Sequence, residues 1–518
     1  MIKKILFISI NNVWRYGNIG MDQLAGYLRE KGFIIDINYY SNKLKIEEIM
    51  ENVILNYDLV AFSVNNSNYQ KCCEISKKIK ESNSKIFIEF GGGYATRYYR
   101  EVLSENKSID FVILGDGEIP FEFILEKLNK NIMLENINHL SIATHFDYQN
   151  RKKMEFLNKE IKHLPIFDYY EKDTKFRNSR KVHCLQTKNN ICTGKCSFCT
   201  ERHGKIFYKD LDEIIKQIRI VYEKYGVKKF FFTDDNLLDP NDKGAKLRIL
   251  ELCKKIEKLN YKLAFQCYMK ASSIGNTELD IALLKYMKKV GFVEIFVGIE
   301  SGNQEDLNLY NKYTTVENNY NIMEKLYKYE LIPIIGFIGF NPYTTLEKIS
   351  KNFKFLCDVK CTYLFNYLYS FVVIDKYVDL YKKIKMDGLL VSNEEEYANV
   401  NYEYQDSSVK EILNYIRFCM LPRLNKLDYE LDWINYSYEE HKIWYNEKVI
   451  NYDSYFIKKK QENLAIIKKY LKILFVEYDL NKFKKIENEF WIFFENQQEE
   501  LKKIYDSLIL LHKNKNFK

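Results

Sequence analysis

The chain has 518 residues, too many for a single hydrophobic core, and at the usual ~100–200 residues per domain its length predicts about three domains. Hydrophobic residues make up 46% of the chain and charged residues 29%, which is typical of a globular protein. The net charge of +8 is spread along the chain without a dense basic block, so we do not expect a nucleic-acid partner.

The first ten residues, MIKKILFISI, combine a basic start with an apolar run, as a signal peptide does. Asn11, Asn12 and Arg15 interrupt this run and no small-residue cleavage site follows, so a buried first strand is the better interpretation. No stretch reaches the ~18 uninterrupted apolar residues that a membrane span needs. We therefore expect a cytoplasmic protein with no membrane partner.

Residues 1–130 alternate short apolar runs with amphipathic stretches. The strand-like runs cover 4–10, 33–39, 59–64, 85–90 and 111–114, and helical periodicity covers 22–31, 46–55, 69–81 and 97–103. Five strands that alternate with helices predict a doubly wound parallel sheet of the α/β class. Ligands of such sheets bind beyond the carboxyl ends of the strands.

Residues 131–180 are polar and irregular, and we interpret them as a connector. A second alternation fills 181–389, with strands at 182–186, 228–233, 262–268, 294–299, 333–340 and 363–373, and helices at 211–224, 246–258, 278–290, 316–329 and 346–358. Six such units predict a partial (β/α)6 barrel with its chemistry at the carboxyl ends of the strands. Residues 390–518 are predicted to be mostly helical.

Eleven cysteines in a long chain without a secretion signal do not indicate a disulfide framework. Three of them, Cys192, Cys196 and Cys199, fall within eight residues directly after the first predicted barrel strand. Three thiolates on one loop can hold three irons of a 4Fe–4S cluster and leave the fourth iron open to another ligand. The alternative is a structural zinc site completed by His203, although zinc usually takes two separated pairs of ligands.

The C-x3-C-x2-C spacing, with the aromatic Phe198 just before the last cysteine, resembles the radical S-adenosylmethionine (SAM) superfamily. The resemblance implies that the open iron binds the amino and carboxylate groups of SAM, with Phe198 beside them. It also implies that one electron, from an external donor such as a flavodoxin or ferredoxin, cleaves SAM to methionine and a 5′-deoxyadenosyl radical.

Two later segments resemble places that contact SAM in this family. Asp234 and Asp235 end the second barrel strand, where the family receives the SAM amino group, and Glu300 and Ser301 end the fourth, where it lines the ribose and methionine. A carboxylate suits hydroxyl and ammonium donors because it is only an acceptor when ionised. The alternatives are that the aspartates cap a turn and that Ser301 caps a helix.

Two further residues extend this resemblance. Gly339 lies at the end of the fifth strand, where the family reads the adenine with backbone groups. Lys270 follows the third strand, near the basic residue that many members use for the SAM carboxylate. Both assignments follow from the resemblance alone.

The first predicted domain resembles the cobalamin-binding domain that is fused to many radical SAM proteins. The resemblance implies cobalamin contacts from strand-end residues, namely Asn65, Ser67, Gly91, Gly92, Gly93, Gly115 and Glu118. The loop at 11–20 contains no histidine, so it cannot supply an imidazole ligand to cobalt. A domain kept only for packing is one alternative; a dinucleotide site is another, but no Gly-x-Gly-x-x-Gly turn follows the first strand.

Two classes of function stay open. The first is an enzyme that transfers a methyl group to an unactivated carbon or to phosphorus through methylcobalamin, or that performs another radical reaction without cobalamin. The second is a non-enzymatic cluster or zinc protein. Fold and cofactor class do not name a substrate, and we expect a small molecule or a peptide, such as a natural-product precursor.

Overall fold

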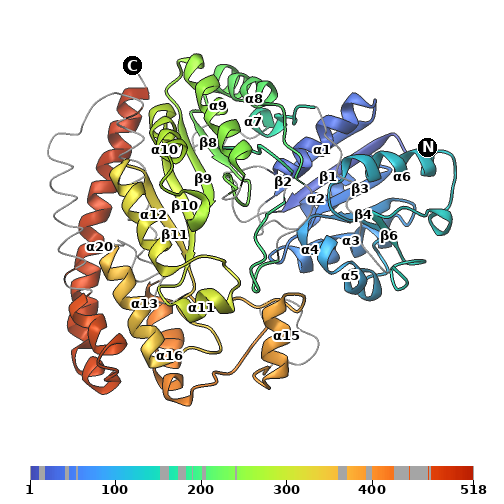
Figure 1. The fold of residues 1–518 in the computed structure, drawn as a ribbon. Coiled ribbons are helices and arrows are strands. Elements are labelled where there is room, and N and C mark those ends of the chain that lie inside the picture. Colours follow the sequence, from blue (N-terminus) through green and yellow to red (C-terminus); the bar gives the residue numbers. More distant parts are fainter. Residues whose placement is uncertain are drawn as a thin grey trace. The chain divides into compact units, whose positions relative to one another are not determined.

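The computed structural model describes residues 2–10, 18–40, 46–53, 56–151, 163–172, 182–189, 191–200, 206–239, 242–359, 370–391, 400–424 and 468–516, and the single positions 443 and 465. The chain forms two compact units (Figure 1). The first comprises Met1–Asn189 and Lys205–Phe231, and the second comprises Asn190–Gly204 and Phe232–Lys518. The domain limits at residues 130, 180 and 389 stay predictions.

The first unit is built on a six-stranded sheet. Its strands are β1 (Lys4–Ile10), β2 (Ile34–Tyr40), β3 (Leu59–Ser63), β4 (Phe87–Gly91), β5 (Phe111–Ile113) and β6 (Ile142–Thr144), in the order β2-β1-β3-β4-β5-β6. The first five are parallel, as predicted, whereas β6 runs antiparallel to β5. Strand β6 lies in the predicted connector, where three residues are too few to show a period-two pattern.

Helices complete the layers of this unit. They are α1 (Ile19–Glu30), α2 (Glu47–Val53), α3 (Tyr69–Ser82), α4 (Gly93–Arg97), α5 (Tyr99–Glu105), α6 (Glu118–Asn129) and α7 (Asp168–Lys172). The Asn18 side chain caps α1 by accepting a hydrogen bond from the Met21 backbone N–H. Phe7, Phe111 and Phe121 are fully buried between the sheet and the helices, and the Phe7 and Phe121 rings lie 5.6 Å apart. Each such side chain contributes about 1.5–3 kcal/mol by leaving water.

A second sheet has five strands in the order β11-β10-β9-β8-β7. They are β7 (Val182–Leu185), β8 (Lys229–Phe232), β9 (Ala264–Lys270), β10 (Phe292–Glu300) and β11 (Ile332–Phe337). The predicted strand at 363–373 falls largely outside the described residues, and its described part forms only the isolated parallel bridge between Phe340 and Phe371. The predicted α/β class, with two sheet domains and a helical end, is confirmed.

The helices that follow these strands are α8 (Leu211–Tyr225), α9 (Lys243–Leu259), α10 (Glu278–Val290), α11 (Gln304–Leu309), α12 (Val316–Lys328) and α13 (Leu346–Asp358). In the second unit, α10 and α12 lie along one side of strands β9 to β11 (Figure 1). The turn from α10 to β10 needs Gly291, because its φ is +105° and a Cβ there would lie 2.0 Å from the Leu263 carbonyl oxygen.

Short helices and one long helix form the C-terminal region. They are α15 (Asp379–Met386), α16 (Lys410–Tyr415), a π-helix (Ile416–Met420), α17 (Leu421–Leu424) and α20 (Leu480–Asn516). Trp491 of α20 is buried, whereas Trp433 and Trp444 lie outside the described residues. Within the parts that the structure describes, no helix is both long and apolar enough to cross a membrane.

Candidate cluster and cofactor sites

The cysteine loop is held by the residue at its centre. Ser197, which stands between Cys196 and Phe198 in the sequence, is buried. Its hydroxyl donates to the Leu309 carbonyl oxygen at 2.7 Å. Its backbone N–H donates to the Tyr310 carbonyl oxygen at 3.0 Å. These two bonds tie the loop to the residues that follow β10, so the cysteines are presented from a fixed backbone. Sequence reasoning gave Ser197 no role, because its partners lie more than a hundred residues away.

Phe198 reinforces this anchor. Its ring meets the buried Tyr310 ring edge-on, with the centroids 5.3 Å apart. It also packs against a buried cluster that includes Ile338 and Ile374. In this structure Phe198 therefore fixes the position of the neighbouring Cys199 by packing.

None of the three cysteines forms a disulfide, and each is partly exposed. In the described part of the chain, no three His, Cys, Asp or Glu side chains converge closely enough to bind one metal ion. A 4Fe–4S cluster does not require such convergence, because each thiolate binds a different iron. His203, the fourth ligand of the zinc alternative, lies outside the described residues.

Cationic side chains approach the cysteine loop. A Cβ on Gly194 would lie 3.0 Å from both Cε and Nζ of Lys270, so the absence of a side chain at Gly194 admits the lysine. Burial raises the pKa of the Cys196 thiol, and the positive charges of Lys312 and Lys270 oppose that rise. Such charges stabilise the thiolate form that a metal needs. Lys270 thus lies beside the cysteine loop, and its contact with the SAM carboxylate stays a prediction.

A buried amide fixes the backbone around Lys270. Asn236 follows Asp234 and Asp235 and is fully buried. Its Oδ1 accepts hydrogen bonds from the Lys270 backbone N–H at 3.1 Å and from the Ser273 hydroxyl at 3.2 Å. Asp234 itself is buried and Asp235 is partly exposed. Both aspartates thus belong to a segment that is tied to the carboxyl end of β9.

Glu300 ends β10 in an unusual conformation. Its φ is +65°, a left-handed value that few residues other than glycine adopt, and the Ser301 N–H donates to the Ile299 carbonyl oxygen at 2.9 Å. Glu300 Oε1 accepts from Lys312 Nζ at 3.0 Å, and the two side chains are only 13% and 7% exposed. Lys312 was not among the predicted site residues, because a lone lysine in a loop carries no motif or period.

The electrostatics of Lys312 follow from its neighbours. Burial alone would lower the pKa of Lys312, but Glu300 and the thiols of Cys196 and Cys199 outweigh burial and leave the pKa above its usual value. The lysine is therefore charged at neutral pH and lies within electrostatic reach of two of the three cysteines.

Ser301 and Gly339 use their polar groups within the protein. The Ser301 hydroxyl is fully buried, bonded to Asn352 Oδ1 at 2.9 Å and to Asp306 Oδ2 at 3.2 Å. It is not the N-cap of α11, which is Asn303, so the helix-cap alternative is wrong. The Gly339 N–H donates to the Ser370 hydroxyl at 3.0 Å.

The strand-end residues of the first unit lie along one edge of its sheet. Asn65 and Ser67 follow β3, and Gly115 follows β5. Gly91 ends β4, Gly92 follows it and Gly93 begins α4, and the three strands are neighbours. Asn65 Oδ1 accepts from the backbone N–H and the hydroxyl of Ser67, which shapes the first of these loops. Glu118 begins α6 and is buried. The loop at 11–17 lies outside the described residues.

Two adjacent glycines of this edge differ in what they tolerate. Gly92 has a φ of +93°, and a Cβ there would lie 2.8 Å from the Val64 carbonyl oxygen. The positive φ and the nearby Val64 carbonyl oxygen therefore require glycine at position 92. A Cβ on Gly93 would have no atom within 4 Å, so this position faces open space.

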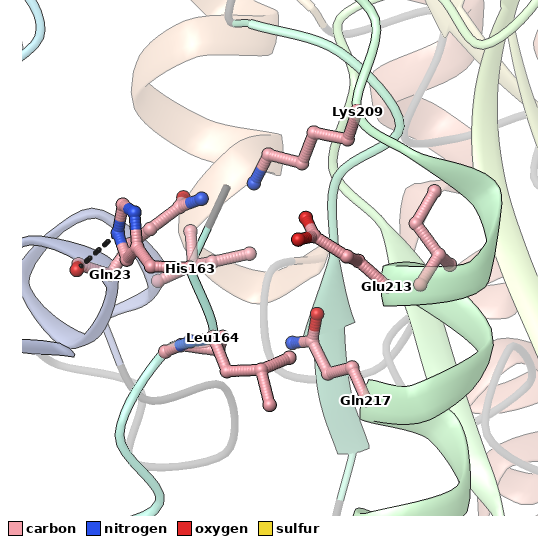
Figure 2. Close-up of a pocket in the computed structure, with 9 residues that line it drawn as sticks. Gln23, His163, Leu164, Lys209, Glu213 and Gln217 are labelled. Carbon is pink, nitrogen blue, oxygen red and sulfur yellow. Dashed lines mark hydrogen bonds between the residues drawn. The ribbon is translucent and has the colours of Figure 1, made fainter. Parts of the chain in front are cut away.

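A small pocket lies elsewhere in the first unit, between α1, the segment at 163–165 and α8 (Figure 2). Lys209, Glu213 and Gln217 point into it from one side, and His163 lies on the other with its Nε2 2.7 Å from the Gln23 carbonyl oxygen. Burial lowers the pKa of His163 to about 4. The space left is enough for about one water molecule, too little for any of the expected cofactors.

Two family models match the chain. The B12 binding domain matches residues 5–125, and the radical SAM superfamily matches residues 188–356. A protein of Pyrococcus horikoshii, described as an uncharacterized methyltransferase, is 24% identical over 343 residues, which cover 65% of this chain and 72% of the relative. The 4'-phospho-dehydrooxetanocin synthase of Priestia megaterium is 24% identical over 364 residues, which cover 65% of this chain and 48% of the synthase.

The fold also resembles a solved structure. The cobalamin-dependent S-adenosylmethionine radical enzyme OxsB, with aqua-cobalamin and S-adenosylmethionine bound, superposes with a TM-score of 0.71 at 15% sequence identity. The match covers 99% of this chain and 79% of OxsB. At this identity the likeness concerns the fold, and it extends over both sheets and the helical C-terminal region.

Proposed function

Because this chain belongs to the cobalamin-dependent radical SAM family, we propose that it transfers a methyl group from SAM to a carbon or phosphorus atom of a small molecule or a peptide. Its cofactors are a 4Fe–4S cluster, SAM and cobalamin. The proposal rests on the order of two sites along the chain. A glycine-lined sheet edge comes first and a fixed loop with three cysteines follows, and the two sites belong to separately matched domains.

We assign the cluster to Cys192, Cys196 and Cys199. Ser197 and Phe198 hold their loop in place, and Lys270 and Lys312 offset the negative charge of thiolates. When bound, the cluster supplies one electron to SAM and an open iron that SAM can chelate. The residues fit this cofactor because the thiols are partly exposed, are not in disulfides and lie next to positive charge.

SAM contacts are proposed for side chains at the carboxyl ends of neighbouring strands. Lys270 offers an ammonium to the SAM carboxylate, and Asp234, Asp235 and Glu300 offer carboxylates to its amino and ribose groups. For Ser301 and Gly339 we propose a positioning role, because their polar groups already bond to the protein.

Cobalamin is proposed to lie over the edge formed by β3, β4 and β5. Gly91, Gly93 and Gly115 leave the backbone bare there, while Asn65 and Ser67 offer polar groups, and Glu118 begins the helix that follows. When bound, cobalamin supplies a cobalt that can carry a methyl group. We accordingly assign residues 1–130 to cobalamin, 131–180 to a connector, 181–389 to the radical SAM barrel and 390–518 to a helical region.

Methyl transfer rather than another radical reaction is supported by the P. horikoshii relative, which is described as a methyltransferase. The second candidate is a radical reaction without methyl transfer, which the Priestia relative favours because its name is that of a synthase. Both need an external electron donor, and we propose a flavodoxin or ferredoxin. We place the reaction in the cytoplasm, where free thiols persist.

Product analysis separates these candidates. The anaerobically purified chain is incubated with methyl-labelled SAM, dithionite and methylcobalamin, and its corrinoid content and both SAM products are measured. Methyl transfer predicts corrinoid uptake and the formation of S-adenosylhomocysteine together with 5′-deoxyadenosine. Deoxyadenosine without S-adenosylhomocysteine would instead support the second candidate, and a chain that forms neither product would contradict both.

A further inference from the structure

A buried ion pair lies close to the segment that holds the cysteine loop. Leu309 and Tyr310, whose carbonyl oxygens accept hydrogen bonds from Ser197, stand just before Lys312 in the chain. We propose that Lys312 raises the reduction potential of the cluster through its positive charge and that Glu300, its partner, opposes it. The pair would thereby set how readily the cluster accepts the electron. This inference rests on the proposed function, since it takes Cys196 and Cys199 as cluster ligands.

The pair is buried at a cost that the fold alone does not explain. Lys312 Nζ lies 3.0 Å from Glu300 Oε1, and the side chains are 7% and 13% exposed. Removing two charges from water costs several kcal/mol per ion, and a buried pair is often no more stable than well-packed apolar residues. The second unit has room for the pair because a Cβ on Gly298 would lie 2.8 Å from Glu300 Oε1 and 3.0 Å from Lys312 Nζ.

The backbone around both residues is strained. Glu300 has a φ of +65°, and Lys312 is flanked by Asn311 at +51° and Tyr313 at +50°. Left-handed values are unfavourable for most residues other than glycine, and they gather at functional sites. One of these residues belongs to the ion pair and the other two flank its lysine, so the backbone is constrained on both sides of the pair.

Both charges lie close to the cysteine loop. A Cβ on Gly298 would lie 3.0 Å from Lys312 Nζ and 2.8 Å from Glu300 Oε1, and Gly298 is paired with Lys270 in the sheet. Lys270 in turn reaches Gly194 of the loop, where a Cβ would lie 3.0 Å from its Nζ. A reduced cluster carries one more negative charge than an oxidised one, so a nearby cation favours the reduced state and a nearby anion disfavours it. Loss of the Lys312 charge should therefore disfavour reduction, and loss of the Glu300 charge should favour it.

The test is a potentiometric titration of the reconstituted chain with dithionite, without SAM, followed by electron paramagnetic resonance. Lys312→Gln should lower the potential, Glu300→Gln should raise it, and the double variant should fall between the two. We expect Lys312→Gln to shift the one-electron reduction equilibrium about tenfold, which corresponds to about 59 mV. Lys312→Arg keeps the charge and should restore the potential.

The matched control is Lys246→Gln. Lys246 forms a comparably buried pair with Asp280 at 2.7 Å on α9 and α10, and its replacement should leave the potential unchanged. Equal potentials in the wild type and both single variants, or shifts of the same sign in Lys312→Gln and Glu300→Gln, would overturn the inference. If the wild-type chain assembles no cluster, the proposed function itself fails, so the two failures are distinguishable.

Discussion

The carboxyl ends of the strands carry different kinds of residue in the two sheets of this chain. The edge of β3, β4 and β5 consists largely of bare backbone, and a Cβ on Gly93 would have no atom within 4 Å. The edge of β9, β10 and β11 instead carries charges, namely the partly exposed Lys270 and the buried pair of Glu300 with Lys312. A bulky ligand needs clearance, whereas a zwitterion and a metal cluster need placed charges. This difference favours chemically different ligands at the two edges.

The largest expected effect comes from the loop beside the charged edge. Replacing Cys192, Cys196 or Cys199 singly with Ala should abolish assembly of the 4Fe–4S cluster, because two thiolates cannot hold it. Iron and sulfide content and the visible absorbance of the reconstituted protein measure this. Cys253→Ala is the matched control, since Cys253 is buried within α9 and its replacement should leave the cluster intact. Full cluster absorbance in Cys196→Ala would show that the cluster is not held by these three cysteines.

The edge of β3, β4 and β5 can be blocked without changing the edge of β9, β10 and β11. Gly93→Arg should prevent corrinoid uptake, because the side chain enters the open space in front of β4, while the cluster still assembles. Corrinoid absorbance and iron content of the same sample test both halves of this statement. Undiminished corrinoid uptake by Gly93→Arg would show that this edge is not the binding site.

Gly92 provides the structural counterpart. Gly92→Ala puts a Cβ 2.8 Å from the Val64 carbonyl oxygen at a φ of +93°, so it should destabilise the first unit itself. The loss should appear in thermal unfolding of the chain before any cofactor is added. A Gly92→Ala variant as stable as Gly93→Ala would contradict this interpretation of the edge.

The charged edge predicts a graded effect rather than an all-or-none one. Glu300→Ala should keep the cluster yet weaken SAM binding, because a lost hydrogen bond to a charged group costs about 1.5–3 kcal/mol, roughly ten- to a hundredfold in affinity. Glu305→Ala is the control, since Glu305 lies nearby but its side chain is 72% exposed. Isothermal titration with SAM under anaerobic conditions measures both. Equal dissociation constants would mean that Glu300 serves only the ion pair.

Much of this arrangement is readable from local sequence. The helices Glu278–Val290 and Leu346–Asp358 and the strand Lys4–Ile10 were predicted with the bounds that the structure gives, because strong periodicity or a continuous apolar run marks them. Helices α6 and α11 were not predicted. Residues whose role depends on distant partners were missed, as Ser197 and Lys312 show. Their neighbours are set by how the strands assemble, which no local pattern records.

The smallest effect concerns two buried titratable groups in the first unit that respond to pH in opposite directions. Burial lowers the pKa of His183 to about 3, so the folded chain keeps it neutral while the unfolded chain protonates it below about pH 6.5. This group therefore makes the fold less stable as the pH falls. Burial raises the pKa of Asp22 to about 7, so its contribution is present at low pH and is lost as the pH rises through about 7.

In the wild-type chain these two trends partly cancel between about pH 7.5 and pH 5.5. Asp22→Asn removes one of them and should leave a chain that loses about 1.4 kcal/mol of stability over this range through His183. His183→Gln, which keeps a side chain next to Gln217 and the hydroxyls of Tyr169 and Tyr170, should show the opposite trend and gain stability as the pH falls. Urea unfolding of the three proteins at both pH values measures the slopes. Parallel slopes in the two variants would show that the altered pKa values of Asp22 and His183 do not affect how the free energy of unfolding depends on pH.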